Sequence, residues 1–101
     1  MVQNKRSLVE LCILALLHKE PQYGYDLSTT IANLINVSDG TIYPILRKLK
    51  VEGIVTTFLA EGQGGPPRKY YQITKMGEEQ YQFEKKNWQM LFHNVGQLME
   101  D

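Results

Sequence analysis

Residues 37–50 carry hydroxyl and cationic side chains at the spacing of a single helix face. The apolar residues of this stretch recur at steps of three and four, which predicts one buried stripe on a helix. They are Ile42, Ile45, Leu46 and Leu49. At about 100° per residue, the opposite face carries Gly40, Tyr43, Pro44 and Arg47, with Thr41 and Lys48 beside it. Such a face could bind phosphates and base edges in a DNA groove, although an ordinary surface helix has the same pattern.

A second group of cations stands beside a loop rich in glycine and proline. Arg68 and Lys69 directly follow the loop sequence EGQGGPP. The backbone amides of Gln63, Gly64 and Gly65 could donate to phosphate, and the two cations could contact the same DNA backbone. The alternative is that the cations only keep an exposed hairpin soluble.

The chain shows no arrangement typical of catalysis. His18 and His93 lack the HExxH spacing of a paired metal site, so we expect both on helix surfaces. The segment GQGGPPRK lacks the GxxxxGK[ST] order of a phosphate loop, and no local Ser–His–Asp context occurs. We therefore expect no enzyme, no catalytic residue, no metal site and no cofactor.

The composition is that of one globular domain with a modest core: 101 residues, 43% hydrophobic and 22% charged. A formal net charge of zero excludes a uniformly basic nucleic-acid binder, but the charge is uneven. Residues 43–75 hold six cations and two anions, a net of +4, whereas residues 76–101 hold two cations and five anions, a net of −3. A basic middle with acidic flanks favours a local phosphate contact patch.

Cys12 is the only cysteine, which excludes an intramolecular disulfide and a structural zinc site of several cysteines. Its apolar surroundings predict a small buried side chain. Lys5 and Arg6 precede an apolar run that Glu10 interrupts, and this run is too short to span a bilayer. We therefore expect no signal peptide, no membrane contact and a cytoplasmic location.

Three helices are predicted in the first half of the chain. Residues 7–18 are apolar nearly all round, so this helix must be covered on more than one side, for which a second subunit is a natural candidate. Residues 24–34 have the apolar spacing of a second helix. The third begins either near Ser38, with Pro44 inside it, or near Thr41, with Pro44 in its first turn. The Ser38 hydroxyl could accept a capping bond from a backbone amide.

The second half predicts two strands and one long helix. β-Branched and aromatic residues indicate strands at 54–60 and 68–74, joined as a hairpin by the Gly/Pro loop. A last helix runs from Thr74 or Lys75 to about Leu98, with apolar residues mainly at helical steps. Because it is long for so small a domain, we expect it to pack on a partner.

This element order predicts a mainly α fold with a β-hairpin. Three helices followed by a hairpin form a winged helix-turn-helix, whose third helix enters the major groove and whose hairpin tip contacts the backbone or the minor groove. Residues 1–74 would form the winged helix DNA-binding domain, and residues 75–101 a C-terminal dimerisation helix.

The motifs LVELCILALL, YGYDL, SDGTIYPILRKLKVEGIV and GGPPRKYYQIT followed by KMG closely resemble the PadR-like transcriptional regulators, over most of residues 8–78. The length and the single long last helix are similar to the smaller subgroup. The resemblance implies a homodimeric winged-helix repressor whose first and last helices form the dimer interface, and it supports a phosphate contact by Tyr43. The DNA contacts we expect are Tyr23, Ser38, Thr41, Tyr43, Pro44, Arg47, Lys48, Gly64, Gly65, Arg68 and Lys69. The interface residues we expect are Leu8, Leu14, Tyr81, Trp88, Leu91, Phe92, Val95 and Leu98.

Trp88 follows Gly77 by eleven residues, a spacing similar to that of a multidrug-sensing branch of the family. In that branch, paired tryptophans across the dimer axis sandwich flat aromatic compounds, where stacking and cation–π attraction would act. The resemblance implies that such a ligand could release the protein from its operator; packing in a dimer core is the alternative for Trp88. The other expected ligand contacts are Ser7, Glu10, Leu11 and Phe92, with Asn87 or Leu91.

Pattern and resemblance together predict a sequence-specific DNA-binding repressor. Two recognition helices would enter successive major grooves of a double-stranded operator, about one helical turn apart. The rival interpretation is a winged-helix adaptor that binds proteins and no specific DNA.

Overall fold

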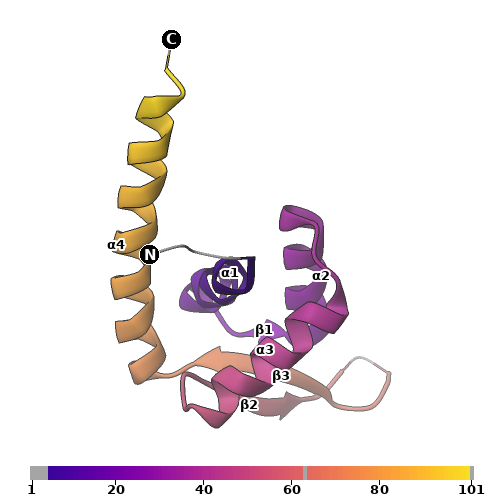
Figure 1. The fold of residues 1–101 in the computed structure, drawn as a ribbon. Coiled ribbons are helices and arrows are strands. Elements are labelled where there is room, and N and C mark those ends of the chain that lie inside the picture. The colour runs from indigo at the N-terminus through magenta and orange to yellow at the C-terminus, as the bar shows by residue number, and fades with distance from the viewer. Residues whose placement is uncertain (1–4, 63, 101) are drawn as a thin grey trace.

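The computed structural model describes residues 5–62 and 64–100, within which four helices and three strands follow one another. They are α1 (Lys5–Lys19), β1 (Gln22–Tyr23), α2 (Gly24–Ile35), α3 (Asp39–Val51), β2 (Val55–Ala60), β3 (Arg68–Ile73) and α4 (Lys75–Leu98). Helix α1 lies at the centre, with α4 on one side and α2 on the other, while α3 and the sheet lie below it (Figure 1). The predicted fold class is confirmed: a mainly helical winged helix-turn-helix with a long C-terminal helix.

The hydrophobic core forms where the apolar faces of α1, α2 and α3 meet the sheet. The predicted stripe on α3 is fully covered, since Ile42, Leu46 and Leu49 are 0% exposed and Ile45 is 1% exposed. Each such side chain gains about 1.5–3 kcal/mol from burial, so the stripe fixes the rotation of α3 about its own axis. That rotation leaves Arg47 on the outside.

The sheet has three antiparallel strands in the order β1–β3–β2, one strand more than the predicted hairpin. Strand β1 has only two residues, which is too short to show an alternating pattern in the sequence. It pairs Gln22 with Tyr71 and Tyr23 with Tyr70, and thereby ties the start of α2 to the hairpin. Of the two adjacent tyrosines in β3, Tyr71 is buried in the core, as strand alternation predicts.

The N-terminus of α3 settles the alternative that the sequence left open. The helix begins at Asp39, so Pro44 lies inside it. The predicted capping bond of Ser38 is wrong: its hydroxyl makes none and lies 3.4 Å from the Thr41 hydroxyl instead. A hydrogen bond from α2 fixes the start of α3: the buried Ser28 hydroxyl donates to the carboxylate of Asp39, the first residue of α3, at 2.6 Å.

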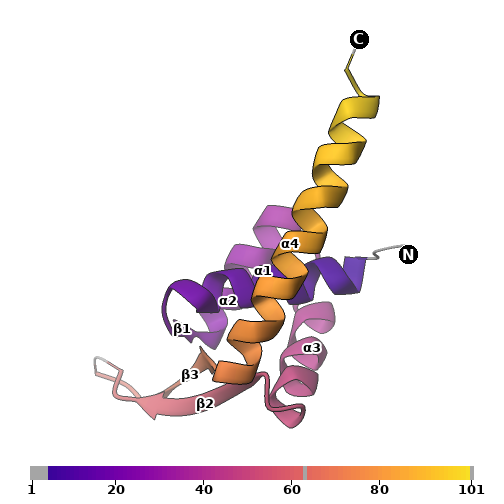
Figure 2. The same ribbon diagram turned by 90° about the vertical axis from the view of Figure 1, so that its left-hand side faces the viewer.

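Helix α4 starts tightly against the hairpin and ends far from it. Thr74 caps its first turn, accepting from the Gly77 amide at 3.0 Å and donating to the Gly53 carbonyl at 2.6 Å. A Cβ on Gly77 would overlap the Ile54 carbonyl oxygen, so glycine is required at this close approach. The second half of α4 extends beyond the other elements (Figure 2). Its exposed apolar side chains are Met90, Leu91, Phe92, Val95 and Leu98, and the exposed Met99 directly follows the helix.

The Ser28–Asp39 bond gives a stability prediction. Replacing Ser28 with Ala removes the donor that Asp39 uses, and we expect a loss of about 1–2 kcal/mol in the free energy of unfolding. Urea unfolding followed by circular dichroism measures this. Thr30→Ala, at an exposed position of the same helix, is the matched control and should cost under about 0.5 kcal/mol. Equal losses in the two variants would contradict the role given to Ser28.

Candidate nucleic-acid interface

A cavity of about 360 Å³ lies where α3 faces the start of α2 and the strand β3. It is lined by Tyr23, Gly24, Tyr25, Tyr43, Arg47, Lys69 and Tyr71. Among these described residues are four phenols and two cations but no carboxylate. Phosphate oxygens accept from such donors, and cationic donors give the stronger bonds. The cavity is therefore suited to an anion, and it joins predicted DNA contacts from three separate elements.

Three members of this cavity, Gly24, Tyr25 and Tyr71, were not among the predicted DNA contacts. Burial raises the pKa of the Tyr71 hydroxyl above its usual range; Tyr43 adds to the rise and Arg47 opposes it. Tyr71 is therefore a neutral hydrogen-bond donor at neutral pH. A Cβ on Gly24 would lie 3.0 Å from Tyr71 Cε1, so glycine lets this ring pack against the start of α2. The signal that places Gly24 and Tyr71 is the pairing of β1 with β3, which the sequence did not reveal.

Arg68, at the end of the hairpin next to its loop, lies over an aromatic ring. The Arg68 guanidinium carbon lies 4.7 Å from the centroid of the Tyr23 ring, within cation–π range. Tyr23 is in turn 6.0 Å from Tyr70, which stacks on Phe58 at 5.5 Å. A second hollow of about 480 Å³ on this side includes Gly65 in its lining, along with Tyr23, Gly62, Pro66, Pro67, Arg68 and Lys69. Arg68 therefore has a defined position beside the loop.

The loop tip offers open backbone, as expected. Gly64 has a φ of +71° and is exposed, and a Cβ on Gly64 or Gly65 would meet no atom within 4 Å. Gln63, the third residue expected to present its amide, lies outside the described residues. On α3, Ser38 and Pro44 are exposed and Thr41 is half-buried, so the start of this helix is accessible.

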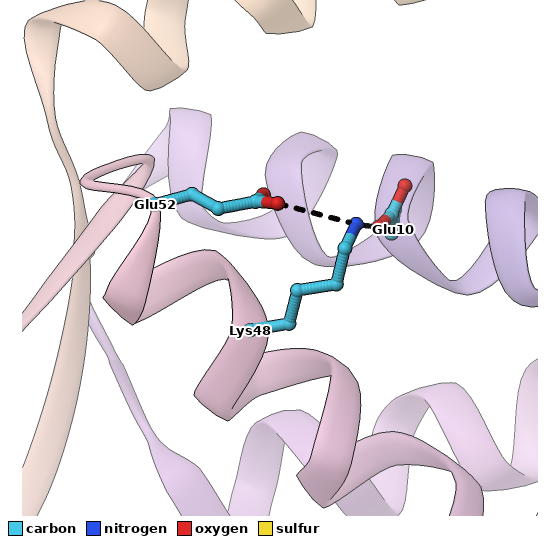
Figure 3. A network of polar contacts seen from close by, with 3 residues as sticks. All are labelled: Glu10, Lys48 and Glu52. Atoms are coloured by element: carbon cyan, nitrogen blue, oxygen red, sulfur yellow. Dashed lines mark hydrogen bonds and ion pairs between the residues drawn. The ribbon is translucent and has the colours of Figure 1, made fainter.

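The structure places Lys48 differently from its neighbours on α3. We expected it beside the outer face, but its ammonium donates to Glu10 of α1 at 2.8 Å and lies 3.6 Å from Glu52 (Figure 3). The hydrogen bond to Glu10 raises the pKa of Lys48. Lys50, which was not singled out from the sequence, lies on the side of Arg47 and Lys69, where these cations line a hollow of about 460 Å³.

The expected ligand contacts fall into separate groups. Trp88 is 6% exposed, its ring lies 5.2 Å from Phe92, and its indole nitrogen is buried with no acceptor among the described residues. Glu10 is engaged by Lys48. Ser7 and Leu11 are half-buried on α1. The structure thus brings Trp88 and Phe92 together, and it directs Glu10 toward α3.

The expected dimer residues differ in how far the chain itself covers them. Leu14, Tyr81 and Trp88 are covered within a single chain, where the Tyr81 ring lies 4.8 Å from His18, so none of the three presents a free surface to a partner. Leu8 is half-buried. The exposed group lies on the second half of α4 and consists of Leu91, Phe92, Val95 and Leu98.

Over residues 5–62 and 64–100, no three His, Cys, Asp or Glu side chains gather in a way that could hold a metal ion. No described helix is both long and apolar enough to cross a membrane. Cys12 is half-buried rather than buried, and desolvation raises the pKa of its thiol. Both histidines are exposed on helices, as expected.

Comparisons with known proteins agree with this geometry. The model of the Transcriptional regulator PadR-like family matches residues 13–83. A PadR-like transcription factor from Bacteroides fragilis is 38% identical over 93% of this chain and 92% of its own, with a TM-score of 0.74. A PadR-like transcriptional regulator from Bacillus cereus is 37% identical over 95% of each chain, with a TM-score of 0.84. A protein of Lysinibacillus sphaericus is 26% identical over 99 residues, which cover 94% of this chain and 91% of its own.

Proposed function

The chain belongs to the PadR-like family of transcriptional regulators, which bind DNA, and we propose that it acts as a homodimeric repressor of a two-part operator. The cavity lined by four tyrosines, Arg47 and Lys69 is the observation that carries this proposal. A DNA backbone phosphate bound in this cavity would contact both α3 and β3. That contact would set how deeply α3 enters the major groove.

The other proposed DNA contacts lie around this cavity. Thr41 and Pro44 would face base edges from the start of α3, with Ser38 at its N-terminus. Arg68, held over the Tyr23 ring, would meet the backbone together with the amides of Gly64 and Gly65. Lys48 is left out of this set, because two carboxylates already surround its ammonium.

Dimerisation is supported by α4. Residues 1–74 would act as the DNA-binding unit and residues 75–101 as the dimerisation helix. Leu91, Val95 and Leu98 are 38%, 43% and 86% exposed, and they follow one another at steps of four and three. An exposed apolar stripe on a protruding helix is stabilised by a second copy of the same helix. Two chains joined in this way would present two α3 helices to one operator.

Direct phosphate contact predicts a change in salt dependence. Arg47→Met should weaken operator binding at least about tenfold and reduce the slope of log affinity against log salt by about two, one contact per chain. Fluorescence anisotropy on the DNA upstream of the protein's own gene, at several salt concentrations, measures both. Lys86→Met, an exposed cation on α4, is the control and should change neither by much. A wild type that binds no DNA specifically would favour the adaptor interpretation instead.

We further propose that a flat aromatic ligand binds beside Trp88 and lowers the affinity of the protein for its operator. The indole N–H is buried and has no acceptor among the described residues, which supports this proposal because an unpaired buried donor costs about 1–3 kcal/mol. Phe92, 5.2 Å away and 54% exposed, would supply a second ring to the same ligand. A ligand between two α4 helices would change the angle between the two α3 helices.

Linkage makes the ligand proposal testable. Trp88 fluorescence is titrated with planar aromatic compounds that do not bind free DNA, with and without saturating operator. Operator should weaken ligand affinity by the same factor by which ligand weakens operator affinity. Phe92→Ala should weaken ligand binding by a larger factor than it weakens operator binding, since Phe92 also lies on the exposed face of α4 proposed to join two chains. Equal ligand affinity with and without operator would sink the idea.

A further inference from the structure

Helix α1 makes one polar contact with α3 and another with α4. Near its N-terminal half, Glu10 accepts from Lys48 of α3 at 2.8 Å (Figure 3). At its C-terminal end, His18 Nδ1 lies 2.8 Å from the Glu78 carboxylate of α4. The first contact therefore lies on the route from the helix proposed to join two chains to the helix proposed to enter DNA.

The surroundings of Lys48 do not suit a phosphate. Glu10 and Glu52 lie 2.8 and 3.6 Å from its ammonium. These three side chains carry a net charge of −1, which the nearby Arg6 offsets, so the ammonium is already neutralised by carboxylates. Arg47, the next residue, lines the tyrosine cavity together with Lys69. Successive residues on a helix differ by about 100° in direction, which explains how two adjacent cations can serve different surfaces.

Apolar packing alone leaves the position of α3 incompletely defined. Hydrophobic contact is non-directional, so a buried stripe resists exposure more strongly than it resists small slides or tilts between helices. A charge-assisted hydrogen bond has a preferred length and direction. The Glu10 side chain is 21% exposed and the Lys48 side chain 42% exposed, so solvent screens the bond mainly from the α3 side.

We propose that the Glu10–Lys48 pair positions the recognition helix: it fixes α3 against α1 and does not itself contact DNA. This inference rests on the proposed function, because it assumes that α3 enters the operator. Lys48 and Glu10 are positioning residues in this account, and Glu52 is a weaker second partner within α3. The pair would hold the two α3 helices of a dimer at the spacing that one operator requires.

Lys48 could either position α3 through Glu10 or contact a DNA phosphate directly. These two roles predict opposite changes in operator affinity for a variant at Glu10. Glu10→Gln removes the charge of the partner and keeps its shape. If the pair positions α3, operator affinity should fall about threefold to tenfold, with the salt slope of the wild type. If Lys48 instead contacts phosphate, the variant frees the ammonium and affinity should rise. Anisotropy titrations at several salt concentrations separate these results.

Variants on α3 provide the matched comparison. Lys48→Met should weaken binding as much as Glu10→Gln does, with no change in salt slope, and the double variant should be no weaker than either single one. Lys50→Met, two residues away on the wing side, should reduce the salt slope instead. A reduced slope in Lys48→Met would overturn the inference.

Exchange of the two charges is the strictest test. In a Glu52→Gln background, Lys48→Glu alone should weaken operator binding more than Lys48→Met, and adding Glu10→Lys should restore most of the loss. A direct lysine–phosphate contact cannot be restored in this way, since the carboxylate at position 48 would repel DNA. Unchanged melting temperatures exclude unfolding as the cause. If the wild-type protein binds no operator, the proposed function is wrong. If the wild-type protein binds the operator but Glu10→Lys does not restore binding to the Lys48→Glu variant, only this inference is wrong.

Discussion

Burial of the apolar stripe on α3 is the constraint on which the rest of the structure depends. A helix has only one rotation that hides Ile42, Ile45, Leu46 and Leu49 together, and all four are at most 1% exposed. This rotation assigns every other side chain of the helix to a surface. Arg47 enters the tyrosine-lined cavity, Lys50 lies on the wing side, and Lys48 turns toward α1. Side chains of the same charge thus acquire different surroundings through helical geometry.

Helix α1 links this rotation to the rest of the molecule. Its buried side chains meet α2, α3 and the sheet in one core, while Glu10 and His18 contact α3 and α4. Beyond Trp88, the apolar side chains of α4 are exposed, and this part of the helix extends past the other described elements (Figure 2). The uncovered apolar stripe therefore lies on the helix that α1 holds in place. In the proposed dimer, the distance between two α3 helices would be set by α1 and α4, although neither would touch DNA.

The order of the elements and the inner face of α3 could be predicted because apolar spacing records the period of a helix or strand. Strand β1 could not be, since two residues carry no period, and with it the roles of Gly24 and Tyr71 were missed. The helical wheel placed Lys48 beside the outer face, but its partner lies 38 residues earlier in the chain. The nearly all-round apolar pattern of α1 suggested a second subunit; yet Leu14 is covered by its own chain. Local patterns contain no information about such partners.

The proposed repressor requires two chains that present two α3 helices to one operator at a fixed spacing. Hydroxyl-radical footprinting of the operator is combined with native mass spectrometry of the complex. A dimer of this kind should give two chains per operator and two protected blocks on one face of the DNA, with centres about 10 base pairs apart. One protected block, with one chain bound, would contradict it.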